Sequence, residues 1–215
     1  MPRTAIGIPP GLARRPNRVL RPKDAQDVYE YPRAEFARLA DRGVLRRLAT
    51  GYFALVPQER LGDRRWTPGI EAAALGIAQA DYGAAAVALM GVSAARHHSA
   101  IPRALALAVV AVPKQRPRME TEVGRIVFVK RDVSRLDLER VDMRLTAGWV
   151  TTIEQTLLDL SARPTLGNVD QRTINEAVKA LAARADWTLV AHLAKEQHKP
   201  AALATAMRTV GHTDA

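Results

Sequence analysis

A polar stretch at residues 58–67 (QERLGDRRWT) interrupts the apolar pattern of this chain and separates two segments of different character. Before it, a proline-rich arm leads into short apolar runs; after Pro68 the chain is rich in alanine and other small apolar residues. The full length of 215 residues suits one large domain or two small ones. We therefore predict a basic arm at 1–22, a small domain at 23–60 and a larger domain at 68–215.

The excess positive charge is concentrated in the first 66 residues. Residues 1–66 hold 14 basic and 7 acidic side chains, whereas residues 67–215 hold 18 and 15. A basic, arginine-rich segment is the electrostatic footprint of a surface that binds phosphates. An arginine-rich composition explains why arginine outnumbers lysine throughout, but it does not explain why the excess charge lies at one end.

Several classes of protein are excluded by composition. The chain contains no cysteine, which removes disulfides, iron–sulfur clusters and zinc sites built on thiolates. Its longest apolar run, residues 104–113, is far shorter than the roughly 18 residues of a membrane helix. Residues 1–16 lack the apolar core of a signal peptide. We expect a soluble, cytoplasmic protein with no membrane partner, no cofactor and no metal site.

Residues 22–56 carry the pattern of two helices followed by a hairpin. A short helix is expected over 22–29 and a second over 33–42, which Gly43 ends in the left-handed conformation. Short apolar runs at 44–48 and 52–56 predict a β-hairpin. This order is typical of a winged helix-turn-helix, whose second helix enters the major groove of DNA.

The segment after Pro68 mixes helical and strand patterns. Helices are expected at 70–79, 84–90, 92–101, 153–162, 171–184, 187–196 and 201–210, and strands at 105–112, 125–130 and 149–152. The predicted fold class is therefore α+β: an N-terminal winged helix-turn-helix followed by a mixed α/β C-terminal domain.

Placing the second helix at 100° per residue predicts a DNA-reading face. Phe36, Leu39 and Ala40 point inward, so small residues beside Arg38 point outward, where an arginine can donate two bonds to guanine. Helix starts and the hairpin would supply phosphate contacts. The candidate DNA-binding residues are Lys23, Arg33, Ala34, Ala37, Arg38, Arg42, Arg46, Arg47, Thr50 and Gly51. The alternative is a solvated amphipathic helix and hairpin with no DNA role.

A second group of basic residues follows the strand at 105–112. It comprises Lys114, Arg116, Arg118, Arg125, Lys130 and Arg131. Three interpretations remain open: a solvated surface, an extension of the DNA footprint, or a surface that meets an acidic or nucleotide-bearing partner.

Other chemistry-bearing residues give weaker signals. His97 and His98 are adjacent, and on a helix they would diverge by about 100°, so a metal site is not expected there. Asp132, Asp137, Glu139 and Asp142 form an acidic cluster in a loop-like stretch, which is the only sequence candidate for a metal-dependent enzyme. No nucleotide-binding or hydrolase signature is present, and we predict no catalytic residues.

Residues 33–56 carry the pattern G-x-L-x-R-L-x-x-G-x-Y, with Phe53 at its aromatic position and Tyr52 just before it. This string resembles the N-terminal domain of the AbiEi-type antitoxins of abortive-infection toxin–antitoxin systems, from which the Tyr-Phe pair is a mild departure. Residues 150–160 (VTTIEQTLLDL) are similar to a recurrent segment of that family, matched at Thr151, Thr156, Leu157, Asp159 and Leu160. The resemblance spans about residues 22–165 and includes a small-residue helix at 87–95.

The resemblance implies an antitoxin that represses its own promoter through double-stranded operator DNA. It also implies that the C-terminal domain neutralises a nucleotidyltransferase-type toxin. Two alternatives stay open: an antitoxin that inactivates its toxin by phosphoryl transfer, using the acidic cluster at 132–142, and a plain repressor that responds to a small-molecule effector.

Overall fold

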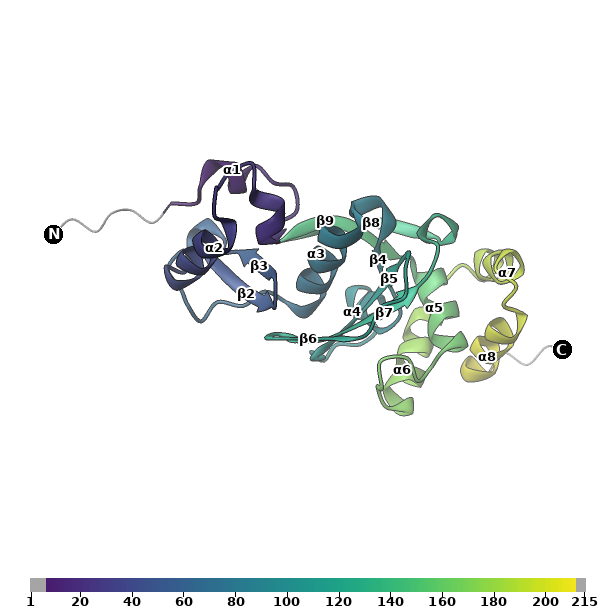
Figure 1. The fold of residues 1–215 in the computed structure, drawn as a ribbon. Coiled ribbons are helices and arrows are strands. Elements are labelled where there is room, and N and C mark those ends of the chain that lie inside the picture. The colour runs from purple at the N-terminus through teal and green to yellow at the C-terminus, as the bar shows by residue number, and fades with distance from the viewer. Residues whose placement is uncertain (1–6, 212–215) are drawn as a thin grey trace.

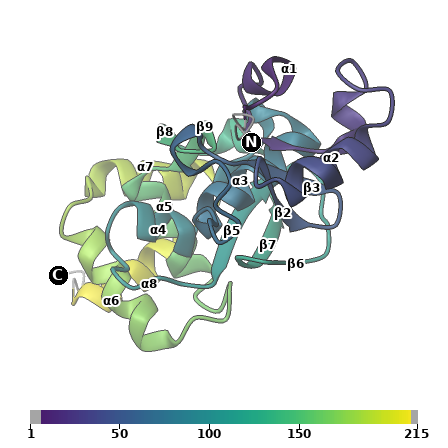
Figure 2. The ribbon, with the colours of Figure 1, turned by 90° about the vertical axis from the view of Figure 1, so that its left-hand side faces the viewer.

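The computed structural model describes residues 7–211, which form a mixed α/β protein (Figure 1). The first six residues of the predicted basic arm lie outside the described residues. Two sheets are present, one of three strands and one of six. Figure 1 places the three-stranded sheet and its helices at the opposite end of the molecule from the last helices, and Figure 2 looks at the molecule from the side of the N-terminal unit.

The N-terminal unit is built around a small antiparallel sheet with the strand order β1-β3-β2. Its elements are α1 (Pro10–Ala13), β1 (Val19–Leu20), the 3-10 helix η1 (Pro22–Ala25), α2 (Pro32–Asp41), β2 (Leu45–Ala49) and β3 (Tyr52–Leu55). Phe36 from α2 is fully buried and meets Phe53 of β3 edge to face, with ring centroids 5.4 Å apart. This contact holds the helix against the hairpin.

The second helix, its end and the hairpin are confirmed. Pro32 occupies the first turn of α2, where its missing N–H costs nothing. Gly43 has φ +69°, and a Cβ there would lie 2.8 Å from the backbone of Gly62, so both the turn and the close approach require glycine. The polar stretch at 58–67, which begins with the 3-10 helix η2 (Gln58–Arg60), therefore packs back on the N-terminal unit.

The predicted helix over 22–29 is wrong, because only the single 3-10 turn η1 forms there. A helix of this length has too few hydrogen bonds to offset the cost of its first turn. Tyr31 precedes Pro32 and is held outside the α region, at φ −121° and ψ 69°, so the segment cannot run on into α2.

The larger unit contains a six-stranded mixed sheet with the order β6-β7-β5-β4-β9-β8. Its strands are β4 (Ala88–Leu89), β5 (Leu107–Val112), β6 (Met119–Thr121), β7 (Gly124–Lys130), β8 (Leu138–Met143) and β9 (Thr146–Thr151). Its helices are α3 (Ile70–Tyr82), α4 (Val92–His97), α5 (Ile153–Ala162), α6 (Gln171–Ala182), α7 (Trp187–Glu196) and α8 (Pro200–Val210), with 3-10 turns η3 (Ala84–Ala86) and η4 (Val133–Arg135).

Helices cover both faces of this sheet. β5 is buried along its whole length, and its side chains alternate between two apolar clusters. One cluster lies under α3 and includes Val19, Leu48 and Ala54 of the N-terminal unit. The other lies under α4 to α8. The mixed α/β class is thus confirmed, and α5 to α7 begin where the pattern predicts them.

One helix prediction after Pro68 is wrong. Residues 84–90 form η3 and the buried strand β4 rather than a helix. β4 lies between β5 and β9 in the middle of the sheet, so strand pairing at Ala88 and Leu89 outweighs the local helix propensity. β8 was also unexpected, since its acidic residues suggested a loop; it is an edge strand, where charged side chains are common.

The two units are joined by partly buried polar contacts. Asp81 of α3 accepts hydrogen bonds from Arg21 (2.6 Å) and Tyr52 (2.7 Å) of the N-terminal unit, and from Arg116. Asn17 Nδ2 donates to the carbonyl of Gly76 in α3 at 2.8 Å. α3 is therefore the surface on which the N-terminal unit is seated. The domain boundary at 58–67 stays a prediction. None of the helices within residues 7–211 is long and apolar enough to cross a membrane.

Candidate nucleic-acid interface

The outward face of α2 is open to solvent. Ala34, Ala37, Arg38 and Arg42 are exposed, while Phe36 and Leu39 are buried in the small core, as the helical projection predicts. The two alanines leave a shallow strip along the helix, so its backbone could lie close to another surface. Arg38, which is 57% exposed, stands beside this strip.

Arg38 is held by an acidic neighbour on the same helix. Its guanidinium donates to Glu35 Oε2 at 2.7 and 3.2 Å, and this hydrogen bond raises the pKa of the arginine. An exposed pair of this kind contributes little stability. The guanidinium therefore stays charged and can exchange Glu35 for a better acceptor.

A groove of about 420 Å³ lies between η1 and the start of α2. Lys23 and Arg33 line it together with Tyr31, whose side chain is 68% exposed. No carboxylate of a described residue lies within 4.0 Å of either cation. The groove thus places two unpaired cations beside the N-terminus of α2, which favours a phosphate, although Glu30 also lines it and adds one negative charge. Tyr31 was not among the residues predicted from the sequence. The signal that could have found it is an aromatic residue directly before the proline that begins the helix.

The hairpin separates its two arginines. Arg47 is exposed and donates to Thr50 Oγ1 at 3.3 Å, next to Gly51, which has φ +82° and open space around its Cα. Arg46 instead contacts Glu122 at 2.8 Å and the carbonyl of Arg64 at 2.6 Å. Arg47, Thr50 and Gly51 therefore form the accessible tip, whereas Arg46 fastens the hairpin to the larger unit.

The second basic group is divided among different contacts. Arg116 binds Asp81 and stacks on Phe128 at 4.3 Å, Arg125 pairs with Glu120, and Arg131 pairs with buried Asp159. Lys114, Arg118 and Lys130 are exposed. Arg116 and Arg131 thus serve the structure of the larger unit, whereas Arg125 forms an exposed surface pair and the three remaining cations are open to solvent.

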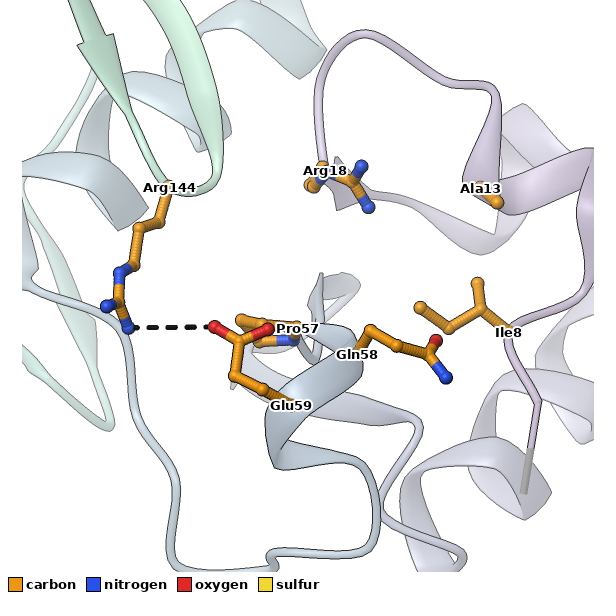
Figure 3. A pocket seen from close by; sticks show the side chains of 7 residues that line it. All are labelled: Ile8, Ala13, Arg18, Pro57, Gln58, Glu59 and Arg144. Carbon is orange, nitrogen blue, oxygen red and sulfur yellow. Dashed lines mark ion pairs between the residues drawn. The ribbon is translucent and has the colours of Figure 1, made fainter. Parts of the chain in front are cut away.

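A further groove of about 500 Å³ opens between the two units (Figure 3). Arg18 and Ile8 line it from the N-terminal side, and Arg144 reaches it from the β8–β9 turn. Glu59 stands opposite Arg144, with 3.9 Å between their charged atoms. The pairing leaves Arg18 as the cation that adds positive charge to this groove.

Three of the four acidic residues predicted as a cluster, Asp132, Asp137 and Asp142, do not assemble as the enzyme alternative requires. Asp132 accepts from the backbone and hydroxyl of Ser134 at the start of η4, which lowers its pKa. Asp137 accepts from Thr152 Oγ1 at 2.7 Å. Within residues 7–211, neither of them nor Asp142 belongs to a cluster with metal-ligand spacing. These carboxylates act as local caps and surface charges.

Comparison with known proteins gives a fold likeness and no family. No family model and no curated protein matches the chain. Among solved structures, the chain is similar to the crystal structure of the Rv2827c protein from Mycobacterium tuberculosis, with 16% identity and a TM-score of 0.53. The match covers 95% of this chain and 80% of the other. At this identity the likeness concerns the fold alone, and it extends across both units.

Proposed function

We propose that this chain is a sequence-specific DNA-binding repressor of the antitoxin type, whose N-terminal unit is a winged helix. The observation that carries the proposal is the exposed strip of Ala34, Ala37 and Arg38 on α2, beside Lys23 and Arg33, which form no ion pair with any carboxylate of residues 7–211. An α-helix of this kind fits the major groove, where small residues permit close approach and arginine reads guanine.

The order of elements supports this assignment. A short helix, a strand, a second short helix, a longer helix and a hairpin follow one another, and β1 pairs with β3 to complete the sheet. In a winged helix, the longer helix reads bases and the hairpin tip contacts the backbone beside it. Here α2 takes the first role and the tip at Arg47, Thr50 and Gly51 takes the second.

The decisive test is binding of the purified protein to the DNA upstream of its own gene, titrated against salt beside a random duplex. We expect a preference of about a thousandfold or more for the upstream DNA, and an affinity that falls steeply as salt rises. Equal, weak binding to both duplexes would contradict the proposal and leave the basic surface as a protein-docking face.

Arg38→Ala tests base reading directly. The variant should lose about 1–3 kcal/mol of binding free energy at the operator and relax the preference for one base pair, while binding to random DNA changes little. The matched control is Arg172→Ala, which removes an exposed arginine from an i,i+4 pair on α6, at the far end of the molecule (Figure 1). Equal losses on both duplexes would refute base reading by Arg38.

Lys23→Ala tests the phosphate groove between η1 and α2. Because Lys23 has no acidic partner among the described residues, removing it should weaken binding to every duplex and reduce the salt slope by about one. Arg46→Ala is the variant to compare with it, because Arg46 already pairs with Glu122 and is less available to a phosphate. A change of sequence preference in the Lys23 variant, with an unaltered salt slope, would contradict this role.

The antitoxin part of the proposal rests on the resemblance of residues 33–56 and 150–160 to that family. The test is co-expression of the chain with a nucleotidyltransferase-type toxin. The Arg38→Ala variant should still relieve toxicity, because the proposed antitoxin role belongs to residues outside the DNA-binding unit. If the Arg38→Ala variant lost both DNA binding and protection against the toxin, the plain repressor would be favoured. Phosphate incorporated into the toxin with ATP and Mg²⁺ would favour the phosphoryl-transfer alternative.

A further inference from the structure

Three side chains with metal-binding atoms meet near one end of α4. His97 is the last residue of that helix, His98 follows it, and Glu139 lies on the edge strand β8. Glu139 Oε1 lies 3.5 Å from His97 Nε2 and 3.9 Å from His98 Nδ1. One ligand atom from each of the three lies within 4.8 Å of the other two.

The expectation that the two imidazoles diverge is wrong: their side chains bring the rings together at the C-terminal end of α4. His98 N–H still bonds to Ala94, but Ser99 adopts φ +61°, a left-handed conformation that turns the chain away from the helix axis. The two rings end edge to face, with centroids 5.2 Å apart. Both therefore face the same carboxylate on β8.

A backbone carbonyl also orients the buried imidazole of His98. His98 Nε2 lies 2.8 Å from the carbonyl of Thr151, and since a carbonyl only accepts, Nε2 must carry the hydrogen. The lone pair is then on Nδ1, the atom that faces Glu139. Arg184 donates to the backbone carbonyl of His98 at 2.6 Å and fixes the backbone at this point. Metal-ligating histidines have this arrangement, with the second nitrogen bonded to a carbonyl or carboxylate.

We propose that His97, His98 and Glu139 form a Zn²⁺ site that ties the end of α4 to the edge strand β8. Zinc takes nitrogen and oxygen ligands at about 2.0–2.2 Å in a tetrahedron, which places neighbouring ligand atoms about 3.3–3.5 Å apart. The spacings to Glu139 need only a slight contraction to reach that value. No fourth histidine or carboxylate of a described residue joins the group, so water completes the tetrahedron on the exposed side.

The inference goes beyond DNA binding and is independent of it. Zn²⁺ titration of the purified full chain, followed by competition with a chromophoric chelator, should give saturable binding of one ion per chain. Co²⁺ in place of Zn²⁺ should give the intense visible absorption of a tetrahedral site. His97→Gln and Glu139→Gln, both at partly exposed side chains, should each weaken Zn²⁺ binding at least about tenfold.

The chain offers a matched control on α7. His192 and Glu196 form an exposed histidine–carboxylate pair at 3.3 Å without a third ligand among the described residues. His192→Gln should leave Zn²⁺ affinity unchanged, and circular dichroism should show that all variants remain folded. Absence of saturable binding, or binding that His192→Gln removes while His97→Gln and Glu139→Gln do not, would overturn the proposal.

Discussion

Replacing Asp159 by alanine should lower the free energy of unfolding by about 3 kcal/mol, because the change leaves two partly buried cations without their counter-ion. Asp159 lies in α5 and is 4% exposed. Its Oδ1 accepts from Arg131 at 3.1 Å and from Lys199 at 3.0 Å. One carboxylate thus joins the residue that follows β7, the helix α5 and the start of α8.

Most of the expected loss of stability comes from the cations that remain when Asp159 is removed. Burial lowers the pKa of Lys199, and the nearby Arg131 and Arg163 lower it further. Asp159 opposes this, since its charge raises the pKa and keeps the ammonium charged. Without the carboxylate, the cations repel one another in a region with little solvent. The expected loss of unfolding free energy lies at the lower end of the range for breaking a buried ion pair, because Arg131 and Lys199 are each about 20% exposed and can regain some water.

Urea denaturation followed by circular dichroism measures this loss. Asp159→Asn is the conservative variant: its amide oxygen can still accept from Arg131 or Lys199, so its loss should be smaller than that of alanine. Glu176→Ala, which breaks an exposed i,i+4 pair on α6, should barely move the denaturation midpoint. If Asp159→Ala moved it as little as Glu176→Ala, the buried carboxylate would have no stabilising role.

The segment at residues 150–160 shows what a sequence motif can and cannot tell. Its threonines and its aspartate were recognisable as a pattern, but the pattern did not show what each side chain bonds to. Thr151 and Thr156 share a buried hydrogen bond of 2.8 Å between their hydroxyl groups, which ties β9 to α5. Asp159 needs Lys199, 40 residues later. The threonine bond depends on how the chain turns from β9 into α5, and the Asp159–Lys199 contact arises only when α8 packs against α5, so neither follows from local periodicity.

The same reason separates the correct element predictions from the wrong ones. α2 and its glycine end depend on local signals, namely a proline start, a spaced apolar face and one left-handed residue. β4 and β8 depend on neighbours in the sheet that are distant in sequence. In the candidate interface, helical projection predicted the exposed face of α2, but it could not reveal that Arg46 turns to Glu122 while Arg47 stays exposed.

Gly76→Ala should destabilise the protein by about 2 kcal/mol or more, although alanine favours a helix over glycine by about 1 kcal/mol. Gly76 lies inside α3, where β1 crosses the helix. A Cβ at this position would lie 2.3 Å from Val19 Cγ2 and 3.2 Å from Asn17 Oδ1. The added methyl would therefore push β1 away from α3 and weaken the hydrogen bond from Asn17 to the Gly76 carbonyl.

Val19→Ala provides the test of this cause. Alone it should also destabilise, because Val19 is 1% exposed and its removal leaves a cavity. In the double variant the new methyl at position 76 occupies the space that the valine leaves, so the combined loss in urea denaturation should fall short of the sum by about 1 kcal/mol. Additive losses would place the strain elsewhere in α3. A Gly76→Ala variant more stable than the parent would mean that only helix propensity acts there, and that the N-terminal unit is not seated tightly on α3.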